Sequence, residues 1–74
     1  MTKREIFKAA TAARHYSKKV ETMRAMLAEA DEADAGGDVE LCSLLQASVT
    51  AMAHTVARDY GKGFYEVMAD VEGE

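Results

Sequence analysis

The sequence contains one cysteine, no proline and no tryptophan in 74 residues. A single cysteine excludes a disulfide within the chain, so Cys42 cannot stabilise a small core by forming one. The absence of proline and the presence of only five glycines remove most breakers of helices. No stretch alternates apolar and polar residues over a convincing length, so we expect no strands. What is missing therefore favours an all-α protein.

The chain also shows no secretory leader and no long apolar run. Residues 1–4 lead into mixed polar sequence rather than into an apolar segment. Residues 41–57 carry no charge, but they are too few and too rich in Ser, Thr, Gln and His for a membrane span. We expect a cytoplasmic protein with a reduced thiol and no membrane partner.

A first long helix is predicted over about residues 3–34. Thr2 and Glu5 have the spacing of a capping box at its start, and Gly36-Gly37 offers a turn at its end. Apolar residues recur at intervals of three and four, which is the seam of a helix that packs along another helix. The seam consists of Ile6, Ala9, Ala13, Tyr16, Val20, Met23, Leu27 and Ala30.

A second helix is predicted over about residues 39–60, with Asp38 as its N-cap. The short turn makes the two helices antiparallel neighbours, so we expect one helical-hairpin domain over residues 1–74. Residues 64–71 resume a helical stripe. Matching the helices across the turn places Phe64 against Ala9 and Val67 against Ile6. This match predicts that 64–71 runs on in line with the second helix, kinked at 61–63. A segment that folds back is the alternative.

The second helix carries a further stripe beside its seam, again with intervals of three and four. We call this set the α2 stripe; it consists of Leu41, Leu44, Ser48, Ala51 and Thr55. A single facing helix cannot cover so wide an arc of apolar and small residues. We expect the stripe to be a dimer or partner interface, with two hairpins forming a homodimeric four-helix bundle. Coverage by the same hairpin, or by a different protein, are the alternatives.

No group of residues has the spacing of a metal, cofactor or catalytic site. His15 and His54 lie on different helices, and together with Cys42 they lack the local spacing of zinc ligands. The acidic residues around the turn lack the alternating ladder of a calcium loop. The segment 61–63 has Lys62 between glycines but no following Ser or Thr, as a phosphate loop requires. We expect no cofactor, no metal and no enzymatic activity.

Phe7, Arg14 and Met26 are candidate partner-binding residues. Phe7 lies off the first seam among cations, where it is either a lid over Phe64 or an anchor for a partner. Residues 1–24 hold seven basic and two acidic side chains. This balance keeps a nucleic-acid partner as an alternative, although the net charge of −4 opposes it.

These features predict a small non-enzymatic regulator, such as an inhibitor, antagonist or co-chaperone, that binds another protein and acts as a homodimer through apolar helix faces. The plan of helix, Gly36-Gly37-Asp38 turn and helix is similar to that of secretion-system co-chaperones and of phage-encoded hairpin antagonists of host proteins. The similarity is one of architecture, with no shared motif. A nucleic-acid-associated regulator and a structural subunit of a larger helical assembly are the alternative functions.

Overall fold

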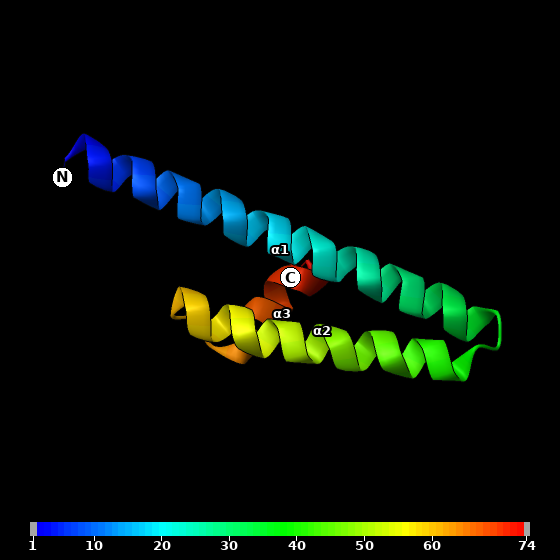
Figure 1. Cartoon of the computed structure of the whole chain (residues 1–74). Helices are drawn as coiled ribbons and strands as arrows, with labels where there is room; N and C mark the ends of the chain where they lie inside the picture. The colour runs from blue at the N-terminus through cyan, green and yellow to red at the C-terminus, as the bar shows by residue number, and fades with distance from the viewer. Residues whose placement is uncertain (1, 74) are drawn as a thin grey trace.

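The computed structural model describes residues 2–73, and nearly all of them are helical. The helices are α1 (Lys3–Ala35), α2 (Val39–Tyr60) and α3 (Phe64–Glu72). Helices α1 and α2 form an antiparallel hairpin, and α3 crosses it from the end of α2 toward the middle of α1 (Figure 1). Residues 2–73 include no strand, and no helix among them is both long and apolar enough to cross a bilayer. The all-α prediction is confirmed.

Both predicted helix starts are present with their caps. The Thr2 hydroxyl accepts a hydrogen bond from the Glu5 backbone N–H at 3.2 Å. The Asp38 carboxylate accepts one from the Leu41 N–H at 3.1 Å. Each cap satisfies a backbone donor that the first helical turn leaves without a partner. The predicted bounds of all three helical segments agree with the structure to within one residue.

The prediction that residues 64–71 continue α2 in line is wrong, because the chain reverses after Tyr60. Gly61 has φ 64°, the left-handed conformation that ends a helix. The Lys62 N–H donates to the Ala57 carbonyl at 2.8 Å and closes this end. Gly63 is extended, with φ −77° and ψ 150°, and α3 begins directly after it. The glycines that were expected to kink one helix instead separate two helices.

Burial of two α3 valines explains the reversal. Val67 and Val71 lie one turn apart and are buried in the same core as Val20 and Val56. Transferring a valine side chain from water to such a core contributes about 1.5–3 kcal/mol. The predicted match of Val67 with Ile6 is therefore wrong: Val67 is fully buried, whereas Ile6 is 54% exposed.

The core has two parts. The main cluster joins all three helices, and a smaller cluster lies near the Gly36-Gly37 turn between α1 and α2. Met23 on α1 is fully buried at the centre of the main cluster, and Cys42 lies in the smaller one. The buried members of the main cluster are Val20, Met23, Val49, Ala53, Val56, Ala57, Val67 and Val71.

The first part of α1 extends beyond the hairpin. Tyr60, the last residue of α2, packs edge-on against Tyr16 with ring centroids 5.4 Å apart. Residues 3–15 therefore project past the end of α2, as Figure 1 shows for the N-terminal part of α1. We call residues 3–15 the N-terminal arm. Ala9 in this arm is exposed, so its predicted contact with Phe64 is also wrong.

Replacing Val67 with alanine tests the packing of α3. Val67→Ala removes buried methyl groups, so we expect the free energy of unfolding to fall by about 2 kcal/mol. Val39→Ala is the matched control, because Val39 is 66% exposed and its change should cost little. Urea denaturation of the two variants measures the difference. Equal stabilities would show that α3 does not pack on the hairpin.

Candidate functional site

The α2 stripe is not covered within the chain. Leu41 and Leu44 are 43% and 64% exposed, and Ala51 and Thr55 are also exposed. Ser48, at the centre of the stripe, is half-buried. The two leucines line a shallow hollow of about 260 Å³ together with Asp38 and Glu40. Two large aliphatic side chains on the surface of so small a chain form an apolar patch that an interface would cover.

The hydroxyl groups of the α2 stripe bond within the helix. Ser48 Oγ donates to the Leu44 carbonyl at 2.9 Å, and Thr55 Oγ1 donates to the Ala51 carbonyl at 3.2 Å. Each hydroxyl thus uses its proton on its own backbone. An approaching surface would meet methyl and methylene groups along the stripe and would leave no hydroxyl proton without an acceptor.

The α2 stripe faces away from α3. His54 on α2 stacks on Phe64 of α3, with ring centroids 4.1 Å apart and planes 15° apart. Ala53 and Ala57, on the neighbouring side of α2, are buried in the main core. At about 100° per residue these alanines lie opposite the stripe around the helix. The hairpin therefore has one side under α3 and a second side open.

Met26 lies on the same open side of the hairpin. Arg24 of α1 contacts α3, and Met26 is about 160° away from it around α1. Met26 is half-buried against the main core. The structure thus places Met26 near the α2 stripe rather than with Phe7 and Arg14, the other two residues predicted to bind a partner.

Phe7 and Arg14 lie on the N-terminal arm, and both are exposed. Phe7 is 72% exposed, so its ring does not form a lid over Phe64, which stacks on His54 instead. The arm carries four basic side chains and one acidic one: Lys3, Arg4, Lys8, Arg14 and Glu5. The one ion pair within residues 2–73 joins Arg58 to Asp59 on α2, so the arm's cations are unpaired in this part of the chain.

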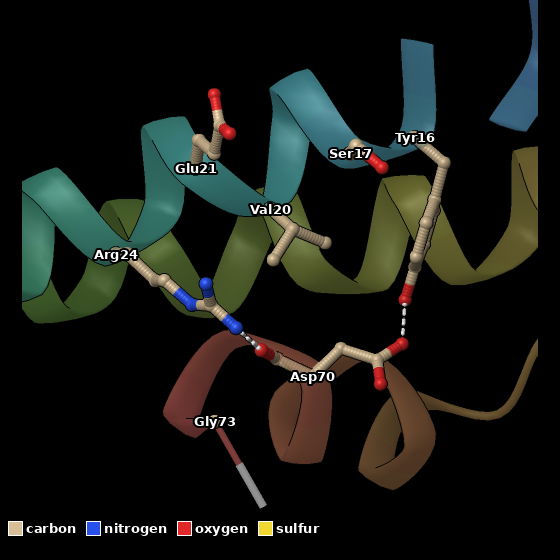
Figure 2. Close-up of a pocket in the computed structure, with 7 residues that line it drawn as sticks. All are labelled: Tyr16, Ser17, Val20, Glu21, Arg24, Asp70 and Gly73. Atoms are coloured by element: carbon tan, nitrogen blue, oxygen red, sulfur yellow. Dashed lines mark hydrogen bonds between the residues drawn. The ribbon is translucent and has the colours of Figure 1, made fainter. Parts of the chain in front are cut away.

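A polar group that the sequence did not predict lies between α1 and α3. The Tyr16 hydroxyl donates a hydrogen bond to the Asp70 carboxylate (Figure 2). Arg24 Nε donates to the Val71 carbonyl at 3.0 Å, and Arg24 Nη2 donates to the Asp70 carbonyl at 2.5 Å. Arg24 thereby satisfies the last carbonyls of α3 and places a cation at the negative end of this helix.

These three side chains border an open groove of about 480 Å³ (Figure 2). Ser17, Val20, Glu21 and Gly73 complete its lining. The arrangement holds α3 in place, since the polar atoms of Tyr16 and Arg24 are bonded to α3 itself.

The contact with α3 changes the chemistry of Tyr16. Its pKa is raised from 10.0 to about 12, first by burial and then by the hydrogen bond to Asp70 and the negative charges of Asp70 and Glu66. Lys62 Nζ lies 4.7 Å from the centre of the same ring. Tyr16 therefore contacts the end of α2, the loop between α2 and α3, and α3 itself, and helps to hold these three parts in place.

Cys42 and the histidines do not converge on a common site. Cys42 is a free, buried thiol in the smaller core cluster. Burial raises its pKa, with further contributions from Asp34 and Asp31. His15 is exposed on α1, whereas His54 stacks on Phe64. Within residues 2–73, no three His, Cys, Asp or Glu side chains come close enough to hold a metal ion.

Comparison of the chain with models of known protein families, with curated proteins and with solved structures gave no match. The sites described above therefore rest on the geometry and chemistry of this chain.

The pKa of Tyr16 gives a pH-dependent test of the contact with α3. Because the folded pKa lies above the unfolded value, the stability that Tyr16 contributes is fully present below pH 10 and is lost as the pH rises through about 12. We expect wild type to lose more stability than Tyr16→Phe across this window, as measured by chemical denaturation. Tyr65→Phe, which changes an exposed ring, should behave like wild type. An identical pH dependence in Tyr16→Phe and wild type would contradict the Tyr16–Asp70 bond.

Proposed function

We propose that the protein is a small non-enzymatic regulator that binds another protein and acts as a homodimer through apolar helix faces. The observation that carries the proposal is the exposed α2 stripe on the side of the hairpin away from α3. Its leucines remain in contact with water, whereas the buried residues of α2 lie on other sides of the helix, against α1 and α3. Covering them would add to the core of a chain that is too short to bury much on its own.

The N-terminal arm supports the protein-binding part of the proposal. Ile6 and Phe7 are exposed on a helix that has no neighbour at this point. An isolated helix of about 13 residues is marginal in water, so a partner that packed on the arm would also stabilise it. Exposed cations flank the two apolar side chains. Such a surface favours an acidic protein with an apolar contact area, because opposite charge speeds the encounter and apolar burial holds the complex.

A nucleic-acid partner is the second candidate, and the same basic arm favours it. Phosphate contacts by Lys3, Arg4, Lys8 and Arg14 would make binding fall steeply with salt. Phe7 and Ile6 lie among these cations and do not contribute to phosphate binding. The net charge of −4 also repels a polyanion. We therefore favour a protein partner, and retardation of a duplex or single strand at low salt would reverse this preference.

Charge placed on the α2 stripe tests the homodimer. Leu44→Asp would bury a carboxylate in the interface, so we expect a dimeric wild type and a monomeric variant at micromolar concentration in sedimentation equilibrium. Thr50→Asp is the matched control, because Thr50 is exposed on α2 outside the stripe. It should remain dimeric. A monomeric wild type would remove the homodimer, and a dimeric Leu44→Asp would show that the interface lies elsewhere.

Truncation of Phe7 tests the arm as a protein-binding surface. An exposed aromatic anchor typically contributes about 2 kcal/mol or more to a complex, so Phe7→Ala should weaken partner binding at least tenfold. Tyr65→Ala is the control, because it removes a similarly exposed ring from α3. The measurement is titration of a partner captured from the native host. Equal loss in both variants, or loss in neither, would contradict a role for the arm.

A further inference from the structure

We propose that two copies of the chain pair antiparallel along α2, with the two-fold axis passing between their Ser48 residues. This inference rests on the homodimer proposed above and specifies its partner surface and direction. The occupant of the open side is a second copy of the same side, made of the α2 stripe and Met26. Helix α3 then lies on the outside of the pair, because it covers the opposite side of each hairpin.

The α2 stripe is complementary to itself when its direction is reversed about Ser48. Leu41 precedes Ser48 by seven residues, and Thr55 follows it by seven. Leu44 precedes it by four, and Ala51 follows it by three. Each leucine of one chain therefore meets a small side chain of the partner subunit, and small residues meet at the axis. Large side chains over small ones are what interdigitating helices require. A parallel pair would instead stack leucine on leucine at one end and leave small residues opposite each other at the other.

The charges of α1 favour the same direction. The hairpin geometry places Ser48 level with about Ala25 of α1. Lys19 lies on one side of this level and Glu29 on the other, and both are within about 60° of Met26 around α1. Reversing the partner brings Lys19 of each chain toward the partner's Glu29. A parallel pair would oppose lysine to lysine and glutamate to glutamate, which is unfavourable.

The length of the surface fits an interface between helices. The α2 stripe spans 14 steps from Leu41 to Thr55, or about 21 Å at 1.5 Å per residue. This is four turns of uninterrupted helix, and its backbone is regular throughout. The small residues at its centre allow the two helix axes to approach to the short end of the usual 8–10 Å range.

This geometry predicts which cysteines can cross-link. With axes about 8–10 Å apart and Cα atoms about 2.3 Å from each axis, residues that face each other have Cα atoms about 3.5–5.5 Å apart. This range overlaps the separation that a disulfide needs. Two Leu44 residues would lie about 12 Å apart along the axis, since eight residue steps separate their levels in the antiparallel pair. A disulfide cannot span that distance.

The test uses Ser48→Cys and Leu44→Cys, each in the full chain with Cys42→Ala to remove the native thiol. Both are oxidised with diamide at a concentration where wild type is dimeric, and covalent dimers are followed on non-reducing gels. We expect Ser48→Cys to form covalent dimer at least about tenfold faster than Leu44→Cys, although the Leu44 position is the more exposed of the two. Sedimentation equilibrium under reducing conditions checks that both variants remain folded dimers.

The possible outcomes distinguish an error in the antiparallel pairing from an error in the proposed homodimer. Cross-linking of Leu44→Cys as fast as that of Ser48→Cys, or faster, would overturn the antiparallel pairing in favour of a parallel one. Slow cross-linking of both variants in a dimeric protein would show that the two chains meet through another surface, while the proposed homodimer would stand. A monomeric wild type would remove both the homodimer and the pairing.

Discussion

The burial of Val67 and Val71 against the hairpin is the contact on which the rest of the structure depends. It holds α3 across one side of α1 and α2, and it leaves residues 3–15 of α1 without a neighbour. The bonds of Tyr16 and Arg24 to α3 follow from this placement, because both side chains reach the end of α3 only after the chain has reversed. One helix of nine residues therefore decides which surfaces are covered and which remain open.

Helix α3 and the proposed partner subunit have similar roles on opposite sides of the hairpin. A core made by α1 and α2 alone would be thin, and short chains commonly gain stability through oligomerisation. In this account the hairpin of α1 and α2 is covered by α3 on one side and by the second copy of the chain on the other side. The arms then extend from opposite ends of the pair, since the antiparallel arrangement brings the Gly36-Gly37 turn of each chain near the start of the partner subunit's arm. A regulator built this way would present two identical basic helices at a fixed separation.

The sequence was informative wherever a feature depends on local spacing. The caps at Thr2 and Asp38 and the turn at Gly36-Gly37 all follow from residues close together in the chain. The exposure of the α2 stripe was also predictable, because one facing helix cannot cover two stripes. Dimerisation through this stripe stays a prediction.

The direction of α3 could not be predicted from the same patterns. The seam of α1 continues to Ile6, so an in-line helix and a reversed helix both offered apolar contacts to Val67. Glycines at 61 and 63 permit either path. The direction of α3 depends on the burial of Val67 and Val71 against residues of both α1 and α2. Spacing within a short stretch of sequence does not predict such long-range contacts. The Tyr16, Arg24 and Asp70 group was missed for the same reason.

The most direct test of the central claim is a distance between identical positions in the two chains. A nitroxide on Val39→Cys, in a Cys42→Ala chain, gives one label per molecule, so any dipolar signal arises between copies. Val39 lies nine residues from Ser48 and on the side of α2 away from the α2 stripe, and the antiparallel pair places the two labels about 30–40 Å apart. Double electron–electron resonance should show a single distance in this range. Absence of a dipolar signal, or a distance of about 20–25 Å as a parallel pair requires, would contradict the account.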